Sequence, residues 1–392
     1  MKIAILTSGI LPVPAVQGGA VENLIDFCLC YNKIHHLHQI TVYSVDHPRL
    51  ASIESYNNDD NHYVHIDTTS WLAKIRRYLY LKLKSRDDYY HYSVEYFFER
   101  AFSFIKKKDY DIILVENRPG YALKLAGKTS ARLVLHQEND FLNNQIQQAQ
   151  AIYDAYSLII NTSAYITDRV KSLNPTDTKC KTVLNGIDTH QFFQAKPASR
   201  GALHFTRNDF IVVYSGRLNK EKGILPLVQA IKQLHSIPHL KLLIIGASSY
   251  GKDKAPTPFI EQLQKESESI GDRVVYTGFI DYQQVPSYLK MADIAVVPSM
   301  WEEPFGLTVV EAMAAGLPLI ATRSGGIPEI CEGIATIVER ENIVDNLVNV
   351  ILDLYEHPEK RCQMALASVK RAKLFDKEIY AQNIFKALES IT

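Results

Sequence analysis

Short apolar runs of five to seven residues recur along the whole chain, and helix-like segments separate them. Five runs lie in the first half, at 2–7, 40–45, 111–116, 132–137 and 157–161. Five more lie in the second half, at 210–216, 241–246, 273–278, 294–299 and 317–322. Continuous apolar runs of this length suit strands that are buried on both faces of a parallel sheet. The pattern therefore predicts an α/β chain with two successive doubly wound, Rossmann-like domains.

A turn signal and a polar stretch separate the two sets of strands. The turn is Asn185-Gly186, and the residues at 194–201 that follow are polar and lack periodicity. We expect an N-terminal domain over 1–187 and a C-terminal domain over 188–374. The chain then ends in an amphipathic pattern at 375–391, which predicts a terminal helix.

Composition and charge restrict the class of protein. Lys plus Arg and Asp plus Glu both number 43, so no basic surplus indicates a nucleic-acid partner. The five cysteines are scattered and odd in number, which favours reduced thiols of a cytosolic protein over disulfides or a zinc site. The apolar N-terminus is interrupted by Thr7, Ser8 and Gly9, and we interpret it as a first strand. No apolar run approaches the roughly 18 residues of a membrane-spanning helix.

The segment 216–223, GRLNKEKG, follows a predicted strand and carries candidate ligand-binding residues. Gly216 permits a tight turn, and Arg217 and Lys222 are cations just beyond the carboxyl end of the strand. Ligands bind at that edge in open α/β sheets, and a guanidinium with an ammonium suits a diphosphate. The alternative is a pair of solvated surface cations beside Glu221.

The segment 302–316, EEPFGLTVVEAMAAG, places two acids beside a predicted helix N-terminus, which ordinarily favours anions. On local grounds Thr308 could be the N-cap of this helix, and Glu311 would then only complete a capping box. That explanation leaves Glu303 unaccounted for. Carboxylates accept hydrogen bonds from hydroxyl groups, whereas cations and free amides hold phosphates. A nucleotide diphosphate sugar, with phosphates between two hydroxyl-rich rings, satisfies both sets of groups.

These motifs together resemble the retaining family 4 glycosyltransferases of the GT-B fold, of the bacterial capsule and exopolysaccharide type. The resemblance rests on GRLxxEKG, TGFI at 277–280, EPFGLTxxEAMAxGxPxIA and SGGIPE at 324–329, and it covers nearly all of the second domain in order. It implies two Rossmann-like domains that face a central cleft. It also implies that the second domain binds the nucleotide sugar, and that a crossover helix at 375–392 returns to the acceptor-side first domain.

The resemblance also implies roles for matching residues. Arg217 and Lys222 resemble the diphosphate cations, and Glu303 resembles the ligand of the transferred sugar's hydroxyls. Glu311 resembles the ribose ligand, which overrides the capping-box explanation. Contacts to the remaining donor atoms are implied for Gly216, Phe279, Ile280, Phe305, Gly306, Leu307 and Thr308.

The first domain carries fewer candidate residues. Gly18 and Gly19 resemble the family's Gly-Gly loop, which closes over the donor diphosphate; the alternative is a plain turn before a helix. His136 resembles the strand-end histidine that approaches the transferred sugar, although a lone histidine is more often structural. The following QEND departs from the family's usual pattern, so Glu138 and Asp140 stay open as acceptor contacts.

A basic segment at 71–86 carries six cations and no acid, with apolar residues between them. Its cations are Lys74, Arg76, Arg77, Lys82, Lys84 and Arg86. Such a segment can lie on an anionic bilayer. It can equally be an amphipathic helix that packs on the first sheet and leaves a basic face in solvent.

The sequence thus predicts a retaining hexosyltransferase that uses a nucleotide diphosphate sugar, in particular a UDP-sugar. The resemblance implies a glycan or lipid-linked acceptor in surface polysaccharide synthesis. It also implies a cytoplasmic enzyme, and leaves open a peripheral location at the inner face of the plasma membrane. No metal cofactor is expected, because no D-x-D ends a strand and no histidines cluster. Alternatives are a nucleotide-sugar epimerase of the same fold and a non-catalytic glycan- or nucleotide-binding subunit. A Rossmann dehydrogenase is disfavoured, since no G-x-G-x-x-G follows the first strand.

Overall fold

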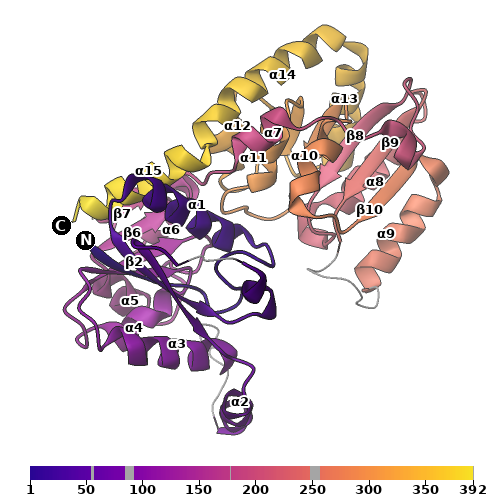
Figure 1. Ribbon diagram of the computed structural model, residues 1–392. Coiled ribbons are helices and arrows are strands. Elements are labelled where there is room, and N and C mark those ends of the chain that lie inside the picture. Colours follow the sequence, from indigo (N-terminus) through magenta and orange to yellow (C-terminus); the bar gives the residue numbers. More distant parts are fainter. Residues whose placement is uncertain (54–56, 84–91, 177, 248–256, 392) are drawn as a thin grey trace. The chain divides into compact units, whose positions relative to one another are not determined.

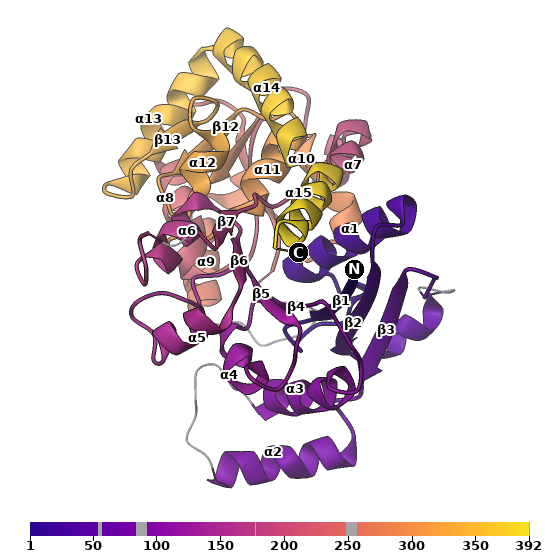
Figure 2. The same ribbon diagram turned by 90° about the vertical axis from the view of Figure 1, so that its left-hand side faces the viewer.

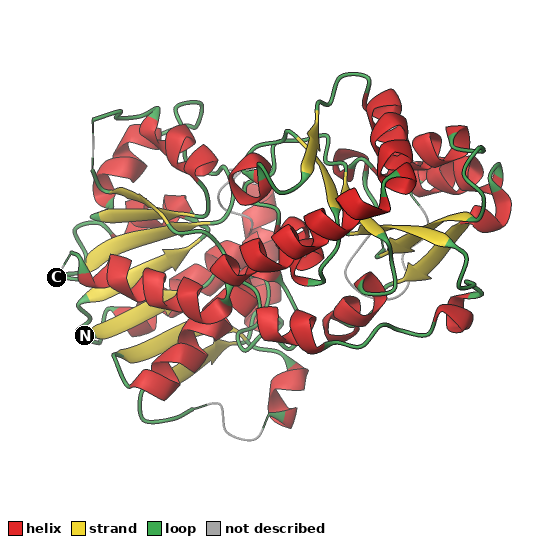
Figure 3. Cartoon of the chain, turned by 90° about the horizontal axis from the view of Figure 1, so that it is seen from above, coloured by secondary structure: helices red, strands yellow, loops and turns green. Residues whose placement is uncertain are grey.

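The computed structural model describes residues 1–53, 57–83, 92–176, 178–247 and 257–391. The chain divides into two compact units (Figure 1), the first made of residues 1–186 and 377–392 and the second of residues 187–376. The boundaries expected from the sequence fall after 187 and after 374. Each unit contains one parallel sheet with helices packed against it, as the yellow strands and red helices of Figure 3 show.

The first sheet has seven parallel strands in the order β3-β2-β1-β4-β5-β6-β7. The strands are β1 (Lys2–Leu6), β2 (Gln39–Val45), β3 (Asn61–Ile66), β4 (Ile112–Glu116), β5 (Arg132–Gln137), β6 (Leu158–Asn161) and β7 (Cys180–Thr182). The α-helices of this unit are α1 (Ala20–His35), α2 (Trp71–Leu83), α3 (Tyr92–Ile105), α4 (Ala122–Leu125), α5 (Ala149–Ala155), α6 (Ala164–Lys171) and α15 (Lys377–Glu389).

Alternate residues of these strands enter two separate cores. Ile3 and Ile5 of β1 pack with α1 and α15, whereas Ala4 and Leu6 pack with α3, α4 and α5. A strand that is apolar on both faces must have helices on both faces, so the continuous apolar runs account for the layers. Figure 2 shows α1 and α15 together on one side of the sheet and α3 and α4 on the other.

The second sheet has six parallel strands in the order β10-β9-β8-β11-β12-β13. Its strands are β8 (Phe210–Ser215), β9 (Leu240–Ile245), β10 (Val274–Gly278), β11 (Ile294–Val297), β12 (Leu319–Thr322) and β13 (Thr336–Val338). The α-helices are α7 (Thr189–Gln194), α8 (Ile224–Gln233), α9 (Pro258–Glu268), α10 (Val285–Leu289), α11 (Leu307–Ala314), α12 (Ile327–Cys331), α13 (Ile343–Glu356) and α14 (Pro358–Ala372).

Both sheets have the strand order of a doubly wound Rossmann-like fold, which confirms the predicted fold class. In each sheet the order reverses between the first strand and the fourth, that is, between β1 and β4 and between β8 and β11. Connections leave in opposite directions from such a switch point, so a crevice opens at the carboxyl ends of the two strands. The fold therefore predicts where each unit can bind a ligand.

All ten strands expected from apolar runs are present, and three further strands were missed. The missed strands, β3, β7 and β13, each lie at an edge of a sheet. They carry polar residues such as His62, His65 and Lys181, and so they show no continuous apolar run. The expected terminal helix is α15, whose Tyr380, Ile384 and Phe385 pack on α1 within the first unit. The five cysteines are free thiols. Within the described ranges, every helix is too short or too polar to cross a bilayer.

Candidate active site

The switch point of the second sheet gathers most of the candidate residues. Gly216, which has φ of 153°, directly follows β8, and Arg217 and Lys222 come next in the chain. Glu303 lies in the segment between β11 and α11. Because β8 and β11 are hydrogen-bonded neighbours, the segments after them emerge side by side. The structure therefore brings together the two motifs that are more than 80 residues apart in the sequence.

Lys222 and Glu303 form an ion pair in which the ammonium lies 2.5 Å from Oε1 of the buried carboxylate. The hydroxyl of Ser299 donates a second hydrogen bond, of 2.7 Å, to the same oxygen. The ammonium also lies 5.2 Å from the centroid of the Trp301 ring. The group expected to bind diphosphate and the group expected to bind sugar thus form an ion pair with each other.

Arg217 is exposed, and its guanidinium makes no hydrogen bond or ion pair within the described part of the chain. Its backbone is held, because the Tyr214 hydroxyl donates a 2.7 Å hydrogen bond to the Arg217 carbonyl. Burial, together with the charge of Glu303, raises the pKa of Tyr214, so its hydroxyl remains a donor at neutral pH. This arrangement anchors the backbone of Arg217 and leaves its side chain available to an anion.

Helix α11 begins at Leu307, with Gly306 as its N-cap at φ of 113°. The suggestion that Thr308 caps this helix is therefore wrong, because Thr308 already lies in the first turn. Amides at the start of a helix lack intrahelical acceptors and point toward the site where an anion can bind. Phe305 is buried against Phe375, with ring centroids 6.0 Å apart, and this packing anchors the loop that leads into the helix.

A neighbouring glycine segment closes tightly on the Glu303 backbone. A β-carbon on Gly325 would lie 2.2 Å from the Glu303 carbonyl oxygen, so a side chain at this position is excluded. Gly326 donates its amide to that carbonyl at 2.8 Å, and the Glu302 carboxylate accepts the Gly325 amide at 2.6 Å. The SGG motif therefore supports the backbone that presents Glu303.

Glu311 lies within α11 and is almost fully buried. Its Oε1 accepts a 2.9 Å hydrogen bond from the hydroxyl of Tyr282, so the capping-box explanation for this residue is wrong as well. Burial raises the pKa of Glu311 to about 7, although the bond from Tyr282 opposes this rise. Phe279, half exposed, and Ile280 precede Tyr282 after β10. Sequence reasoning missed Tyr282 as the partner of Glu311. Its position two residues after the TGFI motif is the feature that could have suggested it.

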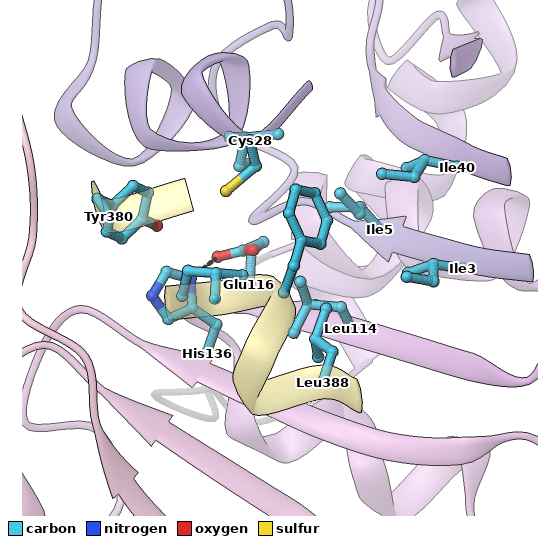
Figure 4. Close-up of a pocket in the computed structure, with 12 residues that line it drawn as sticks. Ile3, Ile5, Cys28, Ile40, Leu114, Glu116, His136, Tyr380 and Leu388 are labelled. Carbon is cyan, nitrogen blue, oxygen red and sulfur yellow. Dashed lines mark hydrogen bonds and ion pairs between the residues drawn. The ribbon is translucent and has the colours of Figure 1, made fainter. Parts of the chain in front are cut away.

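In the first unit His136 is buried between two glutamates at the carboxyl ends of the strands. Its Nδ1 lies 2.9 Å from Oε2 of Glu116, a bond drawn in Figure 4, and its Nε2 lies 3.0 Å from Oε1 of Glu138. The second contact is an ion pair whose angles do not make a hydrogen bond. Burial alone would lower the pKa of His136, but the two carboxylates raise it to about 10. His136 is therefore an imidazolium at neutral pH.

The partners of this histidine are fixed by further contacts. Asn185 donates a hydrogen bond to Glu138, and the Glu138 amide donates to Asn117 at 3.2 Å. Cys28 and Tyr380 lie with Glu116 and His136 along a narrow, mainly apolar pocket (Figure 4). Sequence reasoning missed Glu116, which is the last residue of β4 and pairs in register with His136 of β5. Parallel pairing of two strand ends could have suggested this contact.

The remaining first-unit candidates have separate environments. Gly18 and Gly19 have φ of 74° and 112°, and Gly19 is the N-cap of α1. A β-carbon on Gly19 would lie 2.2 Å from Oε2 of Glu22, so the glycine makes room for that buried carboxyl group. Burial raises the pKa of Glu22 to about 7. Asp140 pairs with Arg169 at 2.8 Å, whereas Glu138 belongs to the histidine cluster.

Among the side chains that the structure describes, no three His, Cys, Asp or Glu residues are placed to hold a metal ion together.

Comparisons with known proteins bear on the family and the fold. Residues 195–371 match the model of the family "Glycosyl transferases group 1". The chain is 29% identical to spore coat protein SA of Bacillus subtilis, with 99% of each chain covered. It is also 29% identical to a lipopolysaccharide 1,2-N-acetylglucosaminetransferase of Salmonella typhimurium, over 40% of this chain and 43% of that one. HepE of Anabaena, crystallised with UDP-glucose, superposes over 100% of both chains with a TM-score of 0.73 and 21% identity.

Residues 195–371, which lie within the second unit, are thus similar to the glycosyl transferases group 1 family, and the superposition identifies the two-sheet fold as GT-B. The family match covers the segments that carry Arg217, Lys222, Glu303 and Glu311.

Proposed function

We propose that this protein is a retaining hexosyltransferase that moves a sugar from a nucleotide diphosphate sugar to a hydroxyl of a glycan or lipid-linked acceptor. The donor is a UDP-sugar, and the product belongs to a surface polysaccharide. The crystallised complex of HepE with UDP-glucose supports the choice of nucleotide. The similarity to a lipopolysaccharide N-acetylglucosaminetransferase supports the choice of acceptor class.

One observation carries the proposal: the cations Arg217 and Lys222 and the carboxylate of Glu303 lie at a single switch point. Arg217 is exposed without a partner within the described chain, and Lys222 is held by its ion pair with Glu303, which a ligand could replace, and by the Trp301 ring. A diphosphate between these cations would free Glu303 to accept hydrogen bonds from sugar hydroxyls. Glu311, which lies in the second turn of α11, would accept hydrogen bonds from the ribose.

The chemistry needs charge stabilisation more than proton transfer to the leaving group, since a nucleoside diphosphate leaves readily. Arg217, Lys222 and the first amides of α11 would stabilise the negative charge that develops as the bond between the sugar's C1 and phosphate oxygen breaks. The acceptor oxygen would attack C1 from the same face, and its proton would pass to the departing phosphate oxygen. The configuration at C1 is then retained, and no bound metal is required.

The proposal assigns supporting roles to the first unit. Gly18 and Gly19 would contribute amides toward the diphosphate, and the imidazolium of His136 would approach the transferred sugar once its contact with Glu138 opened. Phe279 and Ile280 of the second unit would contact the base through their main chain, while Gly216, Phe305, Gly306, Leu307 and Thr308 would line the diphosphate and sugar. Such an enzyme would act in the cytoplasm, at the inner face of the plasma membrane where lipid-linked acceptors are found.

A panel of UDP-, GDP- and ADP-sugars, scored first by thermal shift and then by turnover, tests this proposal. A ligand at about 100 times its dissociation constant adds roughly 2.7 kcal/mol to the free energy of unfolding. We expect UDP-sugars to give the shift, and turnover to require an added lipid or glycan acceptor. Release of an isomerised free sugar without acceptor would instead identify an epimerase. Binding without turnover under every acceptor condition would identify a non-catalytic subunit.

A further inference from the structure

Helix α2 presents its large apolar side chains to solvent instead of to the protein. Five of them are between 46% and 68% exposed, namely Trp71, Leu72, Ile75, Tyr78 and Leu79. At about 100° per residue these five positions share one face of roughly 120°. An apolar face of that width normally covers a core.

The opposite side of α2 attaches it to the first unit. Ala73 is buried and Tyr80 is half-buried, and Arg76 forms an ion pair with Glu99 of α3. Figures 1 and 2 both show α2 on the outer side of α3, away from the sheet. The sequence-based alternative, in which the apolar face of this segment packs on the first sheet, is therefore wrong for the described helix.

Cations accompany the exposed apolar face. The described helix contains Lys74, Arg76, Arg77 and Lys82 and has no acidic residue. Lys82 places its ammonium 4.6 Å from the centroid of the Tyr78 ring, so a positive charge stands within the apolar face. Lys84 and Arg86, two further cations of the basic segment, lie outside the described residues. Indole and phenol rings are favoured at the depth of lipid head groups, and cations are attracted to anionic lipid.

We propose that α2 binds the surface of an anionic lipid bilayer, with Trp71, Ile75 and Leu79 inserted among the head groups and Lys74 and Lys82 near the lipid phosphates. Charge complementarity favours lipid over a second copy of this chain, because two such faces would bring Lys74 and Lys82 of both copies together with no acid of α2 to pair with them. Membrane binding by α2 would give the proposed enzyme a partner. It rests on the proposed function only in that the function explains why the protein would bind a membrane. Adsorption itself requires no sugar transfer, so the two proposals can fail separately.

Vesicle sedimentation of the full-length protein tests this surface. We expect binding to phosphatidylglycerol-containing vesicles and little binding to pure phosphatidylcholine. The variant Ile75→Glu/Leu79→Glu should weaken binding by about tenfold or more, since it removes inserted apolar area and adds repulsive charge. Leu366→Glu/Leu374→Glu is the matched control, because these residues of the second unit are 69% and 57% exposed and should leave binding unchanged.

Fluorescence places the contact on the helix. Vesicles should shift the emission of the wild-type chain to shorter wavelength, and Trp71→Phe, which leaves Trp301 as the remaining tryptophan, should remove the shift. Circular dichroism and the nucleotide-induced thermal shift verify that each variant is folded. Charge reversal by Lys74→Glu/Lys82→Glu is a second variant if the first does not fold, and it should also weaken binding.

Three results would overturn the proposal. The first is wild-type protein that ignores anionic vesicles, and the second is an α2 variant that binds them as wild type does. The third is a wild-type dimer that the α2 variants convert to monomer in the absence of lipid, which would make this face a protein interface.

Discussion

The two parallel sheets share one strand order, but the carboxyl ends of their strands carry different chemistry. In the second unit Arg217 is exposed, and Lys222 pairs with Glu303 at the switch point between β8 and β11. In the first unit Glu116 and His136, at the ends of β4 and β5, are both buried and bonded to each other. The same fold therefore presents an open charged surface in one unit and a closed charged cluster in the other.

The difference shows that the fold determines where charged side chains gather, while their burial determines whether those side chains can bind a ligand. A buried ion pair cannot lose one partner without leaving an unpaired charge, which is strongly unfavourable. In the pair of Lys222 with Glu303 the lysine is partly exposed, so its ammonium can exchange this internal contact for a ligand. The predictions that follow test this contrast.

The largest effect should come from the buried cluster. His136→Ala would leave Glu116 and Glu138 as adjacent carboxylates without their cation, and should destabilise β4 and β5 by about 3–5 kcal/mol. Hydrogen exchange of the amides in those strands measures the change locally. Arg217→Ala is the matched substitution in the second unit and should alter stability by no more than about 0.5 kcal/mol. Equal losses of stability for His136→Ala and Arg217→Ala would contradict the proposed difference between the buried cluster of the first unit and the charges of the second.

The same cluster predicts a pH dependence of stability. The pKa of His136 is about 10 in the folded chain, above its ordinary value of 6.5. Its contribution is therefore fully present below pH 6.5 and is lost as the pH rises toward 10. We therefore expect the amides of β4 and β5 to lose protection against hydrogen exchange over this pH range in the wild type, after correction for the intrinsic exchange rate. In His136→Gln their protection should change less with pH.

The charges at the switch point of the second unit should affect ligand binding and reaction rate. Arg217→Ala should abolish the thermal shift given by nucleotide alone, because it removes a guanidinium from the diphosphate. Glu303→Ala should keep that shift but lower turnover by about 10²–10³, the usual effect of deleting one group that stabilises a transition state. Glu332→Ala, an exposed acid in a surface ion pair, is the control. Normal turnover by Glu303→Ala would show that its assigned role is wrong.

The glycine loop of the first unit should show an intermediate effect. Gly18 and Gly19 both have positive φ, but only Gly19 lacks space for a β-carbon. Gly18→Ala should therefore cost about 1 kcal/mol, and Gly19→Ala up to about 3 kcal/mol, because it also displaces the Glu22 carboxyl group. Thermal unfolding of the two variants, compared directly, measures the difference. Equal costs would mean that the contact with Glu22 has no energetic weight.

The smallest effect concerns the bond between Tyr282 and Glu311. An ionised carboxylate accepts hydrogen bonds from ribose hydroxyls more strongly than a protonated one, and burial raises the pKa of Glu311 to about 7. Affinity for UDP-glucose, measured by calorimetry, should fall several-fold between pH 8 and pH 6. Tyr282→Phe should move this fall to higher pH, because it removes the hydrogen bond that lowers the pKa. A pH profile of Glu311→Gln identical to that of wild type would contradict the assignment.

Sequence patterns were sufficient for the central strands and insufficient for the edges. Strands such as β1 and β8 are covered on both faces, so their apolar runs are continuous and easily found. The edge strands β3 and β7 contain His62, His65 and Lys181, because one side of an edge strand meets solvent instead of another strand. Their pattern is shorter and mixed, and it gives little signal by itself.

The candidate site shows a similar limit. Spacing and resemblance predicted that Lys222, Glu303 and Glu311 belong to one donor site. They did not predict that Lys222 pairs with Glu303, 81 residues away, or that Tyr282 bonds Glu311, 29 residues away. They also missed Glu116 as the partner of His136. Each of these contacts depends on how distant segments approach, which no local pattern encodes.

By itself the amino-acid sequence determined two doubly wound sheets and the order of the motifs at their strand ends, because strands buried on both faces must be apolar along their length. For residues 71–86 it predicted a basic segment with interleaved apolar residues, and it left open whether this segment packs on the first sheet or lies on a bilayer. Only the tertiary structure decided that the apolar face of α2 points outward, that His136 is enclosed by glutamates and that Arg217 is left open. Burial and pairing are properties of three-dimensional neighbours, and those neighbours come from remote parts of the chain.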